Sequence, residues 1–167
     1  MQSFLRRPDI FTYEELVPYI QGDENRAYTR NLVFANDLFA LMVLVWSPKR
    51  DSPIHDHSGS SCYVKAIKGA ILETVYQTKP SDKTITEAEL SDAIKQTRML
   101  KTGQVGYIHD NIGVHKMENA SDDWAVSVHM YTPPFEVCKT FGKSGQINLS
   151  RMEFDTIGGV KTSLSHA

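Results

Sequence analysis

The stretch IHDHSGSSC, residues 54–62, places two histidines one residue apart and a cysteine five residues after the second. Alternate side chains of an extended strand point to the same face, so His55 and His57 can aim both imidazoles at one point. Imidazole is the commonest protein metal ligand. The pair alone fits equally well with two solvated loop histidines beside Asp56. The prediction of a metal site therefore depends on a third ligand elsewhere in the chain.

The composition of the 167-residue chain is ordinary for a globular protein, with 41% hydrophobic and 23% charged residues. This length predicts a single domain over residues 1–167, with a core of about 26–155. The net charge of −2 provides no basic surface for nucleic acid and no polybasic segment for a membrane. We expect neither partner.

The chain shows no apolar run near the roughly 18 residues that a membrane span needs. Its first residues lack the apolar core of a secretory signal. These features predict a cytoplasmic protein. In that compartment Cys62 and Cys138 are expected to be free thiols rather than a disulfide.

The distribution of apolar residues predicts strands after a short helical start. Thr12 and Glu15 fit a capping box, and Pro18 limits the length of that helix. A nearly continuous apolar run over 39–46 is short and bounded by turn residues, which predicts a strand buried on both faces. Further strands are predicted at 28–33, 62–66, 71–76, 97–100, 104–108, 114–119, 125–131 and 146–154.

Many short strands separated by turn residues are typical of an all-β barrel or sandwich. The polar segment 79–95 shows no regular β pattern, and only 87–94 fits a helical turn. The Gly/Ser-rich tail from Gly158 is expected to be loose.

His115 is the candidate third ligand, because it lies within the strand predicted at 114–119 and a strand holds a side chain rigidly. His109 sits beside Asp110 in a predicted turn. His166 lies one residue from the end of the chain, where solvation is expected. The alternative for His115 is a half-buried imidazole that hydrogen-bonds a backbone carbonyl.

The strand predicted at 125–131 carries Ser127, His129 and Tyr131 on one face, while the apolar residues between them face the other way. A polar row opposite an apolar row is the ordinary pattern of a half-exposed strand. The alternative is the wall of a cavity. There Ser127 would orient His129, and His129 would support Tyr131 in proton transfer.

Taken together, these motifs resemble the thiol dioxygenases of the cupin superfamily, and in particular the eukaryotic-type cysteine dioxygenases. The matching stretches are YTRNLV (28–33), IHDH (54–57) with Cys62, YIHDNIGVH (107–115) with Asn119, and AVSVHMYTPPF (125–135). The resemblance extends from about Tyr28 to Phe154, which is most of the chain. It implies the cupin double-stranded β-helix, a small β-barrel.

The resemblance implies one mononuclear Fe(II) held by His55, His57 and His115, with three coordination positions left open. Three neutral imidazoles leave the iron with its full +2 charge, unlike a ligand set that includes a carboxylate. Cys62 stands where cupins tend to have a glutamate ligand. The missing carboxylate suits an anionic substrate that binds through a thiolate sulfur and an amine.

The resemblance assigns Arg30 to the substrate carboxylate, which a guanidinium binds through two parallel hydrogen bonds. Without the matching residues around it, Arg30 would be an ordinary surface arginine. Tyr28 and Tyr131 are expected to assist it, and Trp46 and Met152 to line the pocket.

The resemblance also implies a thioether between Cys62 and Tyr131, made by the iron and O2 themselves, which would act as a protein-derived cofactor. The alternative for Cys62 is a small buried hydrophobic residue, and that is our interpretation of Cys138. A cis peptide bond is expected between Thr132 and Pro133.

The implied activity is oxidation of L-cysteine by O2 to cysteine sulfinic acid in a monomeric enzyme, with both oxygen atoms entering the sulfur. Two alternatives stay open. A related thiol dioxygenase would act on 3-mercaptopropionate or cysteamine, which Arg30 and Cys62 disfavour. A non-catalytic cupin would hold Zn(II) with the same three histidines.

Overall fold

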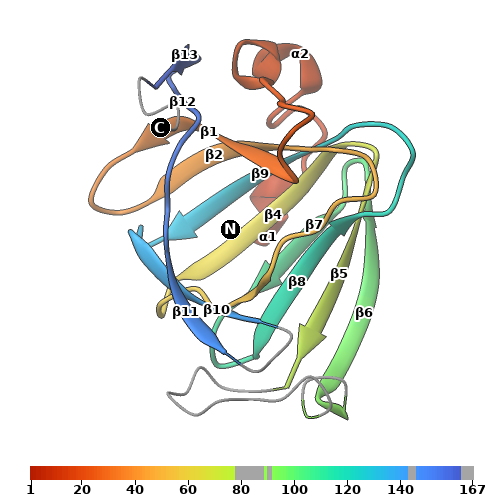
Figure 1. Ribbon diagram of the computed structural model, residues 1–167. Coiled ribbons are helices and arrows are strands. Elements are labelled where there is room, and N and C mark those ends of the chain that lie inside the picture. The colour runs from red at the N-terminus through yellow and green to blue at the C-terminus, as the bar shows by residue number, and fades with distance from the viewer. Residues whose placement is uncertain (78–88, 90–91, 143–145, 163–167) are drawn as a thin grey trace.

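The computed structural model describes residues 1–77, 89, 92–142 and 146–162. Within these ranges the chain forms two β-sheets that face each other and close into a barrel, and α2 lies outside it (Figure 1). The short helical segment precedes all the described strands. The predicted all-β architecture with a short helical start is therefore confirmed.

The described strands follow the order β13-β12-β1-β2-β9-β4-β7 in one sheet and β11-β10-β3-β8-β5-β6 in the other. The first sheet consists of β1 (Tyr28–Ala35), β2 (Ala40–Trp46), β4 (Ser61–Lys68), β7 (Val105–Ile108), β9 (Ala125–Thr132), β12 (Thr156–Ile157) and β13 (Val160–Lys161). The second consists of β3 (Ile54–His55), β5 (Ala70–Tyr76), β6 (Ile94–Lys101), β8 (Val114–Asn119), β10 (Val137–Phe141) and β11 (Ile147–Arg151). The helical elements are α1 (Gln2–Leu5), α2 (Tyr13–Leu16) and η1 (Val17–Tyr19).

Strands β2 and β9 lie in the middle of the first sheet and are buried on both faces. Alternate side chains such as Leu44 join one apolar cluster, which also contains residues of the second sheet. Those between them, such as Val43, pack in a second cluster with Leu16 of α2. The apolar run is therefore a doubly buried strand, as predicted. Of the two interpretations left open for 125–131, the half-exposed strand is wrong, because the N-terminal segment covers the outer face of the strand and its inner face lines a cavity.

The N-terminal segment is divided into α1, α2 and η1. The hydroxyl of Thr12 accepts a hydrogen bond from the Glu15 N–H, and the Glu15 carboxylate accepts one from the Thr12 N–H. This reciprocal pair confirms the predicted capping box. Pro18 lies within η1, where the helical segment ends.

Several predictions at the boundaries of strands need correction. Strand β10 was not predicted. The strand expected over 146–154 ends at Arg151, because its partner β10 begins at Val137 directly opposite. The tail from Gly158 is not loose in its described part, since β13 pairs with β12 and the Gln21 amide donates to the Gly159 carbonyl at 2.6 Å. Half of the helical turn expected at 87–94 lies outside the described residues; in the described half, the Ala93 N–H donates to the Glu89 carbonyl oxygen at 3.0 Å, as in a helical turn, and β6 begins at Ile94.

Candidate metal and substrate site

Three histidines from neighbouring segments converge on one point. His55 ends β3 and lies directly opposite His115 of β8, and His57 follows in the turn after β3. The ligand nitrogens of the three rings all lie within 4.8 Å of one another. Within the described ranges, this is the one group of three or more side chains placed to ligate a metal. The structure thus brings together the three residues that the sequence suggested.

Hydrogen bonds determine which ring nitrogens are free in two of these histidines. Nδ1 of His55 lies 2.9 Å from the carbonyl oxygen of Pro53, and Nδ1 of His115 lies 2.8 Å from Oε1 of Glu73. A carbonyl and a carboxylate accept hydrogen bonds, so each Nδ1 carries the hydrogen and each Nε2 presents a lone pair. The two Nε2 atoms lie 3.2 Å apart. Two facing lone pairs repel each other unless a cation lies beside both.

The imidazole of His57 provides an independent test of whether a metal fits. The ring is buried, and among the described residues neither of its nitrogens has a hydrogen-bond partner, since Oδ1 of Asp110 lies 3.8 Å from Nδ1, beyond hydrogen-bond distance. A buried polar atom without a partner is costly, and a bound cation would satisfy it. Three imidazoles form a ligand set that suits iron, among other transition metals. The residues present therefore fit a mononuclear iron site.

The electrostatic environment favours the neutral form of the ligands. Burial lowers the pKa of His55 and of His115 well below the usual value of an imidazole, and the neighbouring histidines lower it further. Only a neutral imidazole has a lone pair for a metal. The two rings are therefore ready to ligate at neutral pH.

A buried carboxylate that the sequence analysis missed supports His115. Glu73 of β5 is only 1% exposed and accepts hydrogen bonds from His115 and from the guanidinium of Arg98. Hydrogen-bonded carboxylates of this kind fix the tautomer and orientation of ligating histidines. Glu73 lies on the inward face of its strand between the buried apolar residues Ile71 and Val75. A charged residue between two apolar residues on the same face of a predicted strand was the signal in the sequence that could have identified Glu73.

Asp110 supports the turn that carries His57. One carboxylate oxygen accepts the backbone N–H of His57 at 2.8 Å, and the other accepts the N–H of Gly59 at 2.6 Å. Between them Ser58 adopts a positive φ of 50°, a region that side chains other than glycine rarely adopt. Asp110 therefore stabilises a strained turn beside the metal ligands, and the sequence analysis did not single it out.

Ser127, His129 and Tyr131 form a hydrogen-bonded row on β9. The Trp46 indole donates to Ser127 Oγ at 2.8 Å, and Ser127 Oγ lies 2.9 Å from Nε2 of His129. Since the serine hydroxyl is buried and receives the indole hydrogen, its own hydrogen is best placed toward His129. Nδ1 of His129 then carries the ring hydrogen and faces the Tyr131 hydroxyl at 3.5 Å. This polarity leaves the phenolic hydrogen available to another acceptor.

Cys62 and Tyr131 lie directly opposite each other on the paired strands β4 and β9. Both are buried, and neither Cys62 nor Cys138 forms a disulfide. Burial raises the pKa of the Cys62 thiol, which a hydrogen bond with Tyr131 partly offsets, and burial also raises the pKa of the Tyr131 phenol. Both groups therefore keep their protons at neutral pH.

Arg30 of β1 extends toward the same region. Its Nη2 donates to the Tyr28 hydroxyl at 2.8 Å, and its guanidinium carbon lies 4.9 Å from the centre of the Tyr28 ring. The Tyr28 ring in turn packs on Trp46, with ring centres 4.7 Å apart. No carboxylate of the described residues pairs with the guanidinium of Arg30. The group therefore presents a free positive charge.

One cavity is lined by Arg30 and Tyr28, by His55 of the histidine cluster, and by His129 and Tyr131 of β9. Phe135 and Cys138 are two of its lining residues that the sequence analysis did not assign to a pocket. Residues 132 and 133, which precede them, are joined by the predicted cis peptide bond. The lining residues are Tyr28, Arg30, Leu44, Trp46, Ser52, Pro53, His55, Met117, His129, Tyr131, Phe135, Cys138, Thr140, Ser150 and Met152.

The barrel and its three-histidine cluster define a metal-binding protein of the cupin, or double-stranded β-helix, class. A solved structure from Klebsiella pneumoniae, described as an uncharacterised conserved protein with a double-stranded β-helix domain, superposes with a TM-score of 0.55. It is 15% identical, and the match covers 87% of this chain and all of that one. This likeness shows the fold alone.

Residues 12–144 match the family described as cysteine dioxygenase type I. The chain is 39% identical to cysteine dioxygenase type 1 of Bos taurus over 153 residues, which cover 89% of this chain and 72% of that protein. It is 34% identical to the Danio rerio protein of the same name, over 97% of this chain and 77% of that protein. This chain belongs to the cysteine dioxygenase type I family.

Among the described residues, no helix combines the length and the apolar character needed to cross a membrane.

Proposed function

We propose that this protein is an iron-dependent dioxygenase that oxidises L-cysteine with O2 to cysteine sulfinic acid. The observation that carries the proposal is one cavity lined both by Arg30, which has no carboxylate partner among the described residues, and by His55 of the three-histidine cluster, in a chain of the cysteine dioxygenase type I family. A small substrate that has both a thiol and a carboxylate matches these two features.

His55, His57 and His115 would hold one Fe(II), which when bound would ligate the substrate thiolate and activate O2. The protein would contribute three nitrogen ligands and, among the described residues, no ligating carboxylate. Cys62 is a buried protonated thiol rather than a fourth anionic ligand. An anionic substrate would therefore meet no competing negative charge from a ligand.

Arg30 would bind the substrate carboxylate. Its contact with the Tyr28 hydroxyl and ring restricts the guanidinium, which reduces the entropy lost when a carboxylate binds. Trp46 and Met152 would form the apolar wall of the pocket, and Tyr131 of β9, which pairs with the other side of β2, would complete the contact.

The row on β9 would control hydrogen bonding to the substrate. Ser127 orients His129, His129 donates toward the Tyr131 oxygen, and Tyr131 keeps a hydrogen that it can offer to an acceptor in the cavity. The raised pKa of the phenol keeps that hydrogen in place at neutral pH.

We further propose a thioether between Sγ of Cys62 and the ring of Tyr131. The opposed positions of the two residues on β4 and β9 support it. Forming the bond removes the thiol hydrogen and one ring hydrogen, and O2 is the oxidant that accepts them with the two electrons. The intact mass of protein that has turned over should be lower by two hydrogens, and Cys62→Ser should not show this loss. Equal masses would contradict the crosslink.

The test of the function is O2 uptake by purified, iron-loaded protein with L-cysteine, 3-mercaptopropionate and cysteamine. We expect L-cysteine to be turned over best, with sulfinic acid as the product. Arg30→Ala should raise the KM for cysteine more than it lowers kcat, because the guanidinium acts in binding. Absence of O2 uptake with cysteine would refute the proposal, and a preference for 3-mercaptopropionate would redirect it to a related thiol dioxygenase.

The remaining expectations accompany this function. We propose that the enzyme works as a monomer in the cytoplasm, without a nucleic-acid or membrane partner. The net charge of −2 supports the expectation that neither nucleic acid nor a membrane is a partner.

A further inference from the structure

We propose that Asp155 is a positioning residue that holds the backbone of Arg30 and thereby sets the position of its guanidinium. The inference rests on the proposed role of Arg30 as the anchor for the substrate carboxylate. Asp155 precedes β12 and lies 125 residues from Arg30 in the sequence. Nothing in the sequence pattern pointed to it.

Asp155 contacts both polar groups of the Arg30 backbone. Its carboxylate Oδ2 accepts a hydrogen bond from the Arg30 N–H at 2.8 Å. Its own backbone N–H donates to the Arg30 carbonyl oxygen, also at 2.8 Å. A single residue therefore holds Arg30 from one side, while β2 pairs with it on the other.

The carboxylate is needed because the pairing of β1 with β12 begins one residue later. Asn31 lies opposite Thr156 and Leu32 lies opposite Ile157, so the ladder does not include Arg30. Without the side chain of Asp155, the Arg30 N–H would lose its acceptor at this edge of the sheet. A partly buried N–H without an acceptor weakens the local structure.

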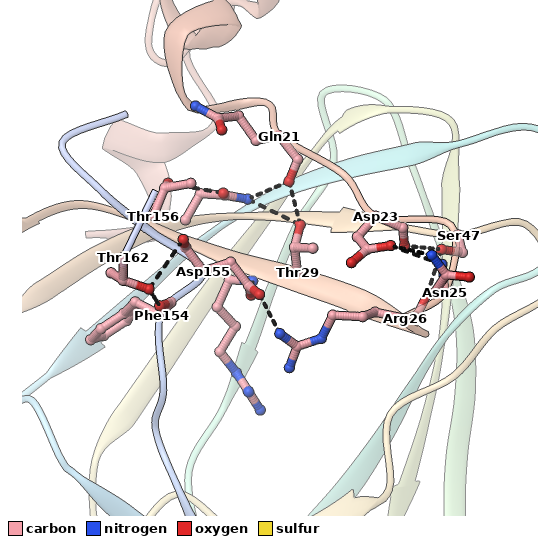
Figure 2. Close-up of polar contacts among 12 residues, drawn as sticks. Gln21, Asp23, Asn25, Arg26, Thr29, Ser47, Phe154, Asp155, Thr156 and Thr162 are labelled. Carbon is pink, nitrogen blue, oxygen red and sulfur yellow. Dashed lines mark hydrogen bonds and ion pairs between the residues drawn. The ribbon is translucent and has the colours of Figure 1, made fainter. Parts of the chain in front are cut away.

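Arg26 holds the carboxylate in this orientation. Its guanidinium pairs with Oδ1 of Asp155, and Figure 2 shows the two side chains facing each other beside β1. The pair is partly buried, with 33% of the Arg26 side chain and 21% of the Asp155 side chain exposed. Hydrogen bonds in which both partners are charged are stronger than neutral ones. The carboxylate is therefore fixed by one arginine while it holds the backbone of another.

Asp155 positions the backbone of Arg30 without neutralising the charge of its guanidinium. Arg26 and Asp155 line a second cavity of about 770 Å³, whereas Arg30 lines the cavity that contains His55. Of the residues that the structure describes, only Met152 lines both cavities. Asp155 thus grips Arg30 through its backbone and leaves the guanidinium unpaired for a ligand carboxylate.

The experiment compares Asp155→Ala, Asp155→Asn and Glu153→Ala in the iron-loaded protein. Glu153 is the matched control, because it lines the same cavity and carries the same charge but is exposed and has no described contact with Arg30. Anaerobic dissociation constants are measured for L-cysteine, 3-mercaptopropionate and cysteamine. Cysteamine lacks the carboxylate and therefore reports everything except the contact with Arg30.

We expect Asp155→Ala to raise the dissociation constants of the two carboxylate-bearing thiols about tenfold and that of cysteamine less than about twofold. Asp155→Asn keeps an acceptor oxygen, so its affinity for these two thiols should fall less. If the alanine variant does not fold, the comparison is made with the asparagine variant. Glu153→Ala should bind all three thiols as the wild type does. In an Arg30→Ala background, Asp155→Ala should cause no further loss.

The proposal would be overturned if Asp155→Ala weakened the binding of all three thiols equally, or if it reduced affinity as much in the Arg30→Ala background as in the wild type. It would also be overturned if the wild type bound the carboxylate-bearing thiols no better than cysteamine. Retained preference for carboxylates without turnover of cysteine would refute the proposed function alone, because the positioning effect is read from binding.

Discussion

Glu73 illustrates how one buried residue determines what a metal ligand can do. The carboxylate is shielded from solvent and lies between His115 and Arg98, so Arg98 compensates its charge while it accepts a hydrogen bond from the neutral imidazole of His115. By accepting the hydrogen of Nδ1, it directs the lone pair of His115 toward the other histidines. The ability of His115 to bind a metal therefore depends on the carboxylate of Glu73 that orients it.

Glu73→Gln should lower the affinity for Fe(II) by about 10- to 100-fold. The amide still offers an oxygen to His115, but it loses the negative charge that makes the imidazole a better donor and that compensates Arg98. The measurement is an anaerobic titration of metal-free protein with Fe(II). Glu118→Gln is the control, since Glu118 lies on the same strand as His115 and, among the described residues, forms an ion pair with Lys116 alone. Equal affinities for the two variants would show that Glu73 does not support the ligand.

At the level of elements, the sequence predicted the strands whose apolar residues follow a regular pattern. The buried run of β2 is the clearest case. Strand β10 was missed because Lys139 and Thr140 interrupt its apolar residues, and its stability comes from pairing with β3 and β11. Such pairing depends on segments that are distant in sequence, which a local pattern does not reveal.

The same contrast holds for the candidate site. His55 and His57 stand out because they are one residue apart, and His115 because it lies within a predicted strand. Glu73 and Asp110 could not be found in this way, since the residues they hold lie 42 and 53 positions away. Metal-ligand spacing is a local signal, whereas the supporting hydrogen bonds arise only when the barrel closes.

Asp110→Ala should loosen the turn between β3 and β4 and lower the affinity for Fe(II) by about tenfold, with little change in the stability of the sheets. The reason is that the variant frees the N–H groups of His57 and Gly59, which now share one carboxylate. Fe(II) titration and thermal unfolding would be measured on the same samples. Asp122→Ala is the control, because the side chain of Asp122 is 93% exposed and lies far along the sequence from the turn. If Asp110→Ala bound iron like the control, the turn would hold its shape without the carboxylate.

At the scale of the whole molecule, the barrel buries several imidazoles in their neutral form. Burial lowers the pKa of His129 to about 3, with further lowering by His55 and His57. An imidazole in the unfolded chain has a pKa of about 6.5. Between these two values the unfolded state binds more protons than the folded state, so the free energy of unfolding falls as the pH falls from about 6.5 toward 3. Above the unfolded-state pKa of about 6.5, His129 no longer lowers the free energy of unfolding.

This difference makes acid sensitivity a property that one residue can change. In metal-free protein, His129→Gln should reduce the slope of unfolding free energy against pH by up to about 1.4 kcal/mol per pH unit between about pH 4 and pH 6. Burial also lowers the pKa of His55 and His115, and their contribution remains in both proteins. The measurement is urea unfolding at a series of pH values, with an unchanged dependence on urea as the sign that both proteins unfold in the same way. Parallel slopes for the two proteins would mean that His129 accepts a proton while the barrel is still folded.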